Sequence, residues 1–486
     1  MRGSPITDAD GSLDGMDNGS FAHVLSVADS GDPGASQPGA AAPGRRTTLI
    51  WRVLPIAGPA LALVLGLVAL GRRPLDAGEA AAVAAANGAF GDVVQRALED
   101  DPARAGYLAL LQPFTGQGAS EAWARLPSAL AAVAAAALMY RVGRTLAGRL
   151  AGLAAALMLA GSAGVAEVSR SARPLTLAIA AMLLSAALFI RAVEDGRVGW
   201  WVGYAVTAAL LPLTHPIAAA ALVAEMAALM AAHDRVRLRN AVPVAGFVMV
   251  ETTLFLTAAI LDRAAAEDGA GRLELTDVAA GIARSCGWSP VVAALAIWGV
   301  VVLASGRVRG SAPWQAVLVA GLVAGPPVAV LVAGIALPVY PAEALVAGAA
   351  GISLAAGIGL AAIPGRRLRL VAAGAALVGA VVALGVVGTG AQEEDWRSAA
   401  AHVRADSGAQ ETVVVLPAWA GSALTHYAPS VGVTRVGRGE GVWVVVLGDP
   451  ESATATARSV VSPPRYALQS QQPFGTRLVV QHWVRP

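Results

Sequence analysis

The sequence predicts a polytopic membrane protein that is all α-helical in the bilayer, with about eleven transmembrane helices and a small C-terminal α/β domain. The composition is one reason, since 56% of the 486 residues are hydrophobic, 14% are charged and the mean hydropathy is +0.61. Apolar runs of about twenty residues also recur along the chain, which is the length that a membrane-spanning helix needs. Nucleic-acid binding is therefore not expected.

The predicted spans follow from these apolar runs, taken in chain order. Their ranges are 49–70, 126–143, 150–166, 174–192, 199–213, 216–232, 241–261, 290–305, 314–337, 343–363 and 370–389. Arginines precede the first span and fill every second loop, for example at Arg141 and Arg144 and again at Arg366 and Arg367. Because cytoplasmic loops carry the arginine excess, we expect the N-terminus in the cytoplasm and the C-terminus outside it.

The N-terminal part of the chain divides into two regions. Residues 1–46 are rich in Gly, Ser, Asp and Pro, which predicts a disordered cytoplasmic tail. Residues 47–389 form the predicted transmembrane domain. Its long outer loop, residues 71–125, opens with RRPLDAGEAAAVAAANGAFGDVVQRALEDD, which we expect to form one or two helices along the membrane surface.

Residues 390–486 differ from the rest because polar residues return between short β-branched runs. The runs ETVVVLP, GVWVVVLGD and TRLVVQHWV predict strands, and DWRSAAAHVRA predicts a helix before them. This pattern indicates an α/β domain outside the cytoplasm. The chain has no lysine and is rich in Ala, Gly, Val and Arg, which is typical of GC-rich bacterial genomes. We therefore expect a multi-pass protein of the bacterial inner membrane.

Five motifs occur in a fixed order along the chain. They are RLPS in a charged stretch, the basic turn GRTLAGRLAG, the juxtamembrane SRSARPL, the turn LLPLTHPIAAAAL, and QEEDWRSAAAHVRA after the last span. Together they resemble the membrane glycosyltransferases that use polyprenyl-phosphate-linked sugars, the protein mannosyltransferases and aminoarabinose transferases of the type C (GT-C) fold. The resemblance covers about half of the chain, and it implies a GT-C fold and transfer of a sugar from a polyprenyl phosphate.

The sequence also departs from the family pattern. The adjacent Asp-Glu pair that members carry after the first span is split here into Asp76 and Glu79. Arg170 and Ser171 replace the Gln and Glu of the juxtamembrane motif, and LPVYPAE keeps Tyr340 but lacks the neighbouring Arg. The resemblance therefore supports the fold more strongly than the activity.

Sugar transfer from a polyprenyl phosphate needs a carboxylate that takes the proton of the acceptor. Asp76 follows the first span, where the resemblance places this base, and Glu79 lies one helical turn later. Asp76 is the first choice for the catalytic residue. The alternative is that Asp76 caps a juxtamembrane helix, as Asp commonly does.

The reaction also needs a cation that holds the leaving phosphate. Arg125 begins the second span, and Arg170 and Arg173 begin the fourth, so all three are expected at the outer surface, where a lipid phosphate lies. Each guanidinium can donate two hydrogen bonds to a phosphate at once. The alternative is that these arginines reach lipid headgroups or pair with Glu121 and Glu167.

Several further residues are weaker candidates. His215, at the outer end of the fifth span, is expected either to bind acceptor or phosphate or to form a local cap. Tyr340 and Glu343 lie in the turn after the ninth span and would line the same cavity. Glu225 and Glu251 fall inside spans, where an ionisable residue is a functional candidate or a protonated member of the bundle. No cofactor is certain, and the scattered carboxylates give no support for a metal site.

The leading hypothesis is an inverting glycosyltransferase that uses a polyprenyl-phosphate-linked sugar and a glycan, lipid or protein of the cell envelope as the acceptor. Membrane lipid and the lipid-linked sugar would be its partners. A catalytically silent relative that binds lipid or an envelope protein is the strongest alternative, because the motifs are incomplete. A transporter is a third class, and it would predict repeated halves.

Overall fold

The structure is a computed structural model of the 486-residue chain. It describes residues 53–116, 120–236, 241–250, 253, 275–308, 310–336, 342–388, 392–408, 410–461 and 465–486. The tail predicted at residues 1–46 lies outside the described residues, as do Glu251, Tyr340 and the side chain of Glu343.

The membrane bundle consists of helices that overlap the predicted spans, together with α13 (Leu275–Ser285), which lies in the stretch predicted as an outer loop. They are α3 (Ala57–Leu67), α7 (Glu121–Ala160), α8 (Ala163–Ser169), α9 (Leu175–Asp195), α10 (Val198–Thr214), α11 (Ala219–Ala231), a helix at Ala241–Val250, α13 (Leu275–Ser285), α14 (Pro290–Ala304), α15 (Pro313–Ala336), α16 (Ala349–Ala362) and α17 (Arg366–Gly388). Short 3-10 turns add η1 (Leu54–Ile56), η4 (Pro216–Ala218) and η5 (Ala342–Gly348). The predicted helical, multi-pass membrane protein is confirmed.

The number of helices that cross the membrane depends on their length and hydropathy. Among the described residues, five helices are long and apolar enough to cross a membrane. The number rises to six if Val278–Ser285 and Pro290–Ala304, which meet at 81°, count as one broken span. The presence of about eleven transmembrane helices therefore remains a prediction.

The second and third predicted spans are the two arms of α7. The helical geometry breaks at Ala147 and Gly148, where Gly148 has φ +88°, a conformation that favours glycine. The arms then pack closely, since a Cβ on Gly143 would lie 2.8 Å from Cα of Gly152. The hairpin thus depends on glycine at both the turn and the contact.

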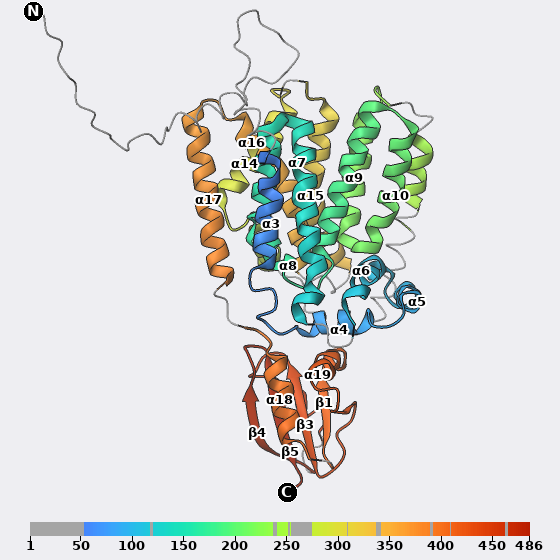
Figure 1. Ribbon diagram of the computed structural model, residues 1–486, viewed down its shortest axis with the longest axis vertical. Coiled ribbons are helices and arrows are strands. Elements are labelled where there is room, and N and C mark those ends of the chain that lie inside the picture. The colour runs from blue at the N-terminus through green and yellow to red at the C-terminus, as the bar shows by residue number, and fades with distance from the viewer. Residues whose placement is uncertain are drawn as a thin grey trace, which may run out of the picture.

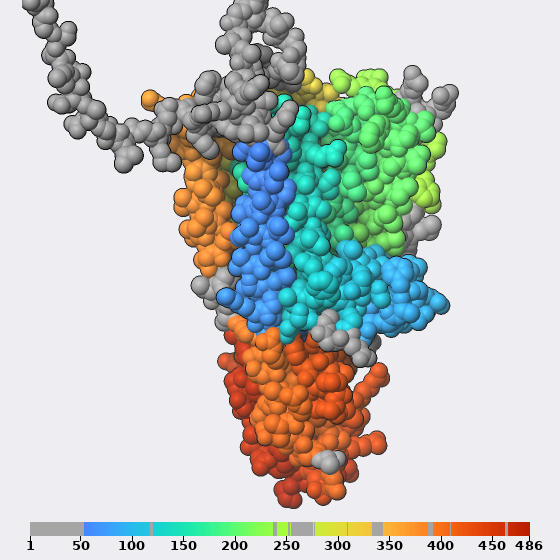
Figure 2. All heavy atoms as spheres, in the orientation of Figure 1, coloured from blue at the N-terminus to red at the C-terminus, as the bar shows by residue number. Residues whose placement is uncertain are grey.

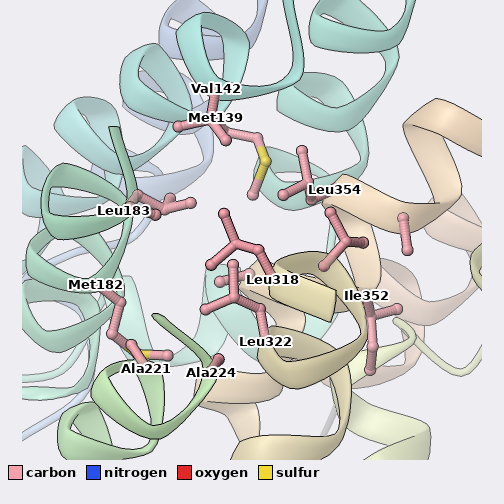
Figure 3. Close-up of a cluster of buried hydrophobic side chains, with 14 of the residues drawn as sticks. Met139, Val142, Met182, Leu183, Ala221, Ala224, Leu318, Leu322, Ile352 and Leu354 are labelled. Carbon is pink, nitrogen blue, oxygen red and sulfur yellow. The ribbon is translucent and has the colours of Figure 1, made fainter. Parts of the chain in front are cut away.

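The core of the bundle consists mainly of small and aliphatic side chains, contributed by most of its helices. Figure 3 shows part of this cluster, with side chains from α7, α9, α11, α15 and α16 pointing toward one another. Those labelled are Met139, Val142, Met182, Leu183, Ala221, Ala224, Leu318, Leu322, Ile352 and Leu354. At the edge of the bundle, only 11% of the most apolar stretch of α17 is buried, as expected for a helix that faces lipid.

The segment between the first and second spans folds into short helices at one end of the bundle. They are α4 (Ala77–Ala85), α5 (Phe90–Asp100), η2 (Pro102–Arg104), α6 (Ala105–Leu111) and η3 (Gln112–Phe114). Figure 1 shows them between the bundle and the C-terminal domain, and we call this end of the bundle the domain end. The helices expected in this loop are thus present.

The C-terminal domain contains a five-stranded mixed sheet in the order β2-β1-β3-β5-β4. Its strands are β1 (Thr412–Leu416), β2 (Val433–Thr434), β3 (Gly441–Leu447), β4 (Ala467–Pro473) and β5 (Leu478–Val484), and its helices are α18 (Trp396–Asp406), η6 (Ala418–Ala420), α19 (Gly421–Tyr427) and α20 (Ala453–Ala457). The strand β1 is parallel to β2 and β3, whereas β5 is antiparallel to β3 and β4. The predicted small C-terminal α/β domain is confirmed.

The two faces of this sheet bury different partners. Val413, Trp443 and Val480 pack with α18 and α19, whereas Val444 and Val479 on the opposite face pack with α20. The first of these cores continues into the membrane part of the chain, because α4 contributes buried side chains to it. The space-filling view shows the domain seated directly against the domain end of the bundle (Figure 2).

Candidate active site

The start of α4 carries the two acidic residues that the sequence analysis selected. Asp76 is the N-cap of α4, and its Oδ1 accepts the N–H of Glu79 at 2.8 Å. Glu79 Oε2 in turn accepts the N–H of Asp76 at 3.0 Å, which completes a capping box. The capping role considered for Asp76 is therefore present, and the spacing of three residues between the two carboxylates is the spacing that this motif requires.

Glu79 forms a buried ion pair with Arg125. Their side chains are 3% and 5% exposed, and the guanidinium donates to both carboxylate oxygens of Glu79, from Nε at 2.8 Å and from Nη2. Glu79 Oε1 also accepts the N–H of Ala172 at 2.7 Å. Both carboxylate oxygens of Glu79 are thus engaged by donors of the protein in a buried position.

Arg125 has a structural role as well. Its Nη1 donates to the carbonyl oxygens of Leu70 and Arg73, and its Nη2 donates to that of Pro74. Together with the two bonds to Glu79, these contacts use all five N–H groups of the guanidinium. Direct contact between Arg125 and a phosphate, expected from the sequence, would require breaking this network.

Arg173 lies beside Asp76. Its Nη2 donates to Asp76 Oδ2 at 2.8 Å, and the two side chains are 31% and 30% exposed. A Cβ on Gly78 would lie 3.3 Å from Asp76 Oδ1 and 3.7 Å from Arg173 Nη2, so glycine leaves room next to the pair. The structure therefore joins a carboxylate and a cation in a partly exposed position at the domain end.

Arg170 follows α8, three residues before Arg173 in the chain. It caps the C-terminus of α8, where its Nε donates to the carbonyl of Ala166 at 3.0 Å. Burial and the neighbouring positive charge of Arg73 lower the pKa of Arg170. The negative charge of Glu167 opposes this shift in the pKa of Arg170.

His215 and Glu225 lie on other elements. His215 Nδ1 accepts the N–H of Ile217 at 3.1 Å, which is the local cap considered from the sequence. Glu225, on α11, is fully buried in the bundle, where its Oε2 accepts the hydroxyl of Ser185 at 3.0 Å. The hydrogen bonds described for these two residues do not join them to Asp76.

The sequence analysis missed two side chains of the C-terminal domain region that touch the start of α4. Tyr427 OH accepts the N–H of Leu75 at 2.7 Å, and Glu394 Oε2 accepts the N–H of Ala77 at 2.9 Å. These partners are separated by 352 and 317 residues along the chain. Glu394 lies in the motif QEEDWRSAAAHVRA, but a sequence motif carries no signal for a contact of this range.

The stability of the protein should depend on pH through Glu394. Burial, and then the nearby charge of Asp76, raise the pKa of Glu394. Between its ordinary pKa and its raised pKa, such a carboxyl binds more protons in the folded state than in the unfolded state. Its contribution to the free energy of unfolding therefore falls as the pH rises through this range. The amide side chain introduced in the variant Glu394→Gln cannot titrate, so the variant does not lose stability in this way as the pH rises.

We therefore expect the melting temperature of Glu394→Gln relative to wild type to increase between about pH 4 and pH 7. Thermal unfolding of both proteins in detergent across this range measures the difference. A difference that stays constant with pH would show that Glu394 has an ordinary pKa. Glu393→Gln, at an exposed neighbouring position, serves as the control for removing a carboxylate from this segment.

An apolar groove of about 530 Å³ lies elsewhere, along α14 and the start of α17. It is lined by Pro290, Val291, Ala294, Leu295, Trp298, Ile363, Pro364 and Leu368. None of these residues belongs to the cluster around Asp76. No group of three or more His, Cys, Asp or Glu side chains in the described part of the chain has the arrangement of a metal site.

Comparisons with known proteins agree with this architecture. Residues 108–261 match the family described as dolichyl-phosphate-mannose-protein mannosyltransferase. ArnT from Cupriavidus metallidurans, in the crystal structure bound to undecaprenyl phosphate, superposes with a TM-score of 0.55 at 14% identity, over 89% of this chain and 98% of that chain. The chain has the GT-C fold. The resemblance that the motifs indicated is thereby confirmed.

Two further solved structures are similar to this chain. Apo ArnT gives the same TM-score of 0.55 at 13% identity, over 90% of this chain and 98% of that chain. The archaeal oligosaccharyltransferase AglB from Archaeoglobus fulgidus is too distant to support an argument, with a TM-score of 0.48 and 10% identity over 78% of this chain and 64% of that chain. No curated protein matches the sequence.

Proposed function

We propose that the protein is a membrane glycosyltransferase that transfers a sugar from a polyprenyl-phosphate donor to a cell-envelope acceptor, with inversion at the anomeric carbon. The observation that carries the proposal is the partly exposed pair of Asp76 and Arg173, because it brings together the base and the cation that the reaction needs. The undecaprenyl phosphate bound by ArnT, which shares the fold, supports this class of donor.

In the proposed reaction, Asp76 accepts the proton of an acceptor hydroxyl as its oxygen attacks the anomeric carbon of the sugar. The bond between this carbon and the phosphate oxygen breaks, and the polyprenyl phosphate leaves with the bonding electrons. Arg173 stabilises the negative charge of the leaving phosphate, and Arg170 adds positive potential. A single displacement of this kind inverts the configuration.

Asp76 retains the capacity to act as the base although it caps α4. Its Oδ1 accepts one hydrogen bond from Glu79 N–H, and its Oδ2 accepts one from Arg173. Each carboxylate oxygen has two lone pairs, so both oxygens have room for a further donor. The cap fixes the direction of the carboxylate, which favours proton transfer from a correctly placed hydroxyl.

The arrangement in the membrane is part of the same proposal. We propose a cytoplasmic N-terminus, with α4 and the C-terminal domain on the outer face of the bacterial inner membrane, and the arginine pattern supports this orientation. The division at residues 47–389 and 390–486 then separates a donor-binding membrane domain from an acceptor-facing domain. The donor lipid would enter from the bilayer, and the acceptor would approach beside the C-terminal domain.

Arg173→Gln tests the phosphate-binding role. We expect the affinity for undecaprenyl phosphate to fall by about tenfold or more, because a charge-assisted hydrogen bond to phosphate contributes about 1.5–3 kcal/mol. Binding to the protein in lipid nanodiscs measures the loss. Arg144→Gln, at an exposed site beside the turn of α7, is the control and should bind as wild type. Equal affinity in all three proteins would remove Arg173 from the phosphate site.

A catalytically silent relative that binds a polyprenyl phosphate is the alternative function. It is favoured by the engagement of Arg125 and Glu79 in a closed structural network. The two functions differ in one measurement. Wild type that binds the lipid carrier and moves its sugar to an acceptor is an enzyme, whereas wild type that binds the carrier and leaves the sugar in place is the silent relative.

A further inference from the structure

Three consecutive backbone N–H groups at the start of α4 are each held by a side chain. The N–H of Leu75 donates to Tyr427 OH at 2.7 Å, that of Asp76 to Glu79 Oε2 at 3.0 Å, and that of Ala77 to Glu394 Oε2 at 2.9 Å. Two of these three acceptors follow the last membrane helix in the chain. The proposed base, Asp76, thus lies between two residues whose backbone N–H groups donate to side chains of the C-terminal region.

Tyr427 is itself fixed by two further side chains. Its hydroxyl donates to Glu121 Oε1 at 3.1 Å, and the same oxygen of Glu121 pairs with Arg397. Burial raises the pKa of Tyr427, so the phenol stays protonated and keeps this bond at neutral pH. The tyrosine on α19 is therefore bonded to the start of α7 and, through Glu121, linked to α18.

Glu394 is fixed from its own side of the interface. Its Oε2 accepts the indole N–H of Trp396 at 2.6 Å as well as the N–H of Ala77. Trp396 is fully buried and shares a hydrophobic core with Leu75 and Ala77. The carboxylate is therefore held between α4 and Trp396 in a partly buried position, where hydrogen bonds are stronger than in water.

We propose that Tyr427 and Glu394 are positioning residues for Asp76, so that the C-terminal domain holds the carboxylate of Asp76 in the orientation that sugar transfer requires. This inference rests on the proposed function and gives the domain a role in the chemical step. The physical reason is that a displacement of about 1 Å in a reacting group can cost about a hundredfold in rate. Neither residue touches the reacting atoms in this account.

Hydrogen–deuterium exchange of the full-length protein in nanodiscs tests the contacts without requiring activity. In Tyr427→Phe and in Glu394→Ala we expect peptides covering residues 75–78 to exchange about tenfold faster, the effect of losing roughly 1.4 kcal/mol of hydrogen bonding. The strands β3 and β5 should exchange as in wild type. Unchanged exchange at 75–78 in both variants would overturn the inference.

The chain offers a matched control for each variant. Tyr466→Phe removes a hydroxyl that donates to the carbonyl of Gly439 within the C-terminal domain, far along the chain from α4. Glu393→Ala removes an exposed carboxylate next to Glu394. Neither control should change the exchange of residues 75–78, which separates loss of the positioning contacts from a general effect on the domain.

Kinetics test the positioning role. We expect kcat to fall at least about tenfold in Tyr427→Phe and Glu394→Ala, while the Kd for undecaprenyl phosphate stays within about twofold and the controls keep their kcat. Faster exchange at residues 75–78 with an unchanged kcat would overturn the inference and leave the proposed function intact. A wild type that binds the carrier without transferring sugar would overturn the proposed function, and the positioning role with it.

Discussion

Asp76→Asn should abolish sugar transfer while the protein stays folded. We expect kcat to fall by about 10²–10⁴-fold, the usual contribution of a general base. Asn is as good an N-cap as Asp, so the variant keeps the bond to the N–H of Glu79 and loses the basic carboxylate and its charge pair with Arg173. Initial rates of transfer at saturating donor, with the melting temperature measured in parallel, give both parts of the expectation.

The matched control for this substitution is Asp92→Asn. Asp92 lies in the first turn of α5 and is exposed, so it belongs to the same segment without contacting Asp76. Its rate should equal that of wild type. An Asp76→Asn protein that keeps its rate would show that the carboxylate is only a cap, and another residue would then have to accept the proton.

Arg125→Lys should destabilise the protein strongly. Lysine keeps the positive charge but has three donors and no planar fork, so it cannot bond both oxygens of Glu79 and three backbone carbonyls at once. Breaking a buried ion pair costs about 3–5 kcal/mol. We expect a large drop in the apparent melting temperature in detergent, measured by fluorescence-detected unfolding.

The partly exposed pair of Arg104 and Asp101 provides the contrast. Their side chains are 37% and 30% exposed and lie three residues apart on the chain, a geometry that contributes about 0–1 kcal/mol. Arg104→Lys should therefore melt close to wild type. If Arg125→Lys melted as high as Arg104→Lys, the buried network would not be what holds residues 70–79 against α7.

The sequence predicted the elements whose burial pattern is regular. Strands β1, β3 and β5 carry β-branched runs because they occupy the middle of the sheet and are buried on both faces. The edge strand β4, with sequence ALQSQQP, is exposed along its whole length and so has no apolar signal. The two-residue β2 is too short for any periodicity to show.

The candidate site was predictable in part. Asp76 and Arg173 are both predicted from the sequence, since each lies at the outer end of a predicted span and the resemblance points to them, and the structure places them 2.8 Å apart. The different environments of Asp76 and Glu79 could not be predicted, because burial is a property of the folded chain. One residue of the split pair is about a third exposed and the other is enclosed by Arg125.

The split of the family's Asp-Glu pair has a structural consequence. With two residues between them, Asp76 and Glu79 form the capping box that starts α4, and Glu79 also anchors α7 through Arg125. Adjacent residues cannot form this box. The departure from the family pattern is therefore compatible with a working site, provided that Asp76 alone serves as the base.

The most direct test of the account is transfer by purified wild-type protein in lipid nanodiscs, with a panel of radiolabelled polyprenyl-phosphate sugars and an isolated cell-envelope fraction as the acceptor. The account predicts that label from at least one donor moves to the envelope fraction and that free polyprenyl phosphate accumulates in equal amount. Donor that binds tightly while its label stays on the carrier, with every member of the panel, would contradict it.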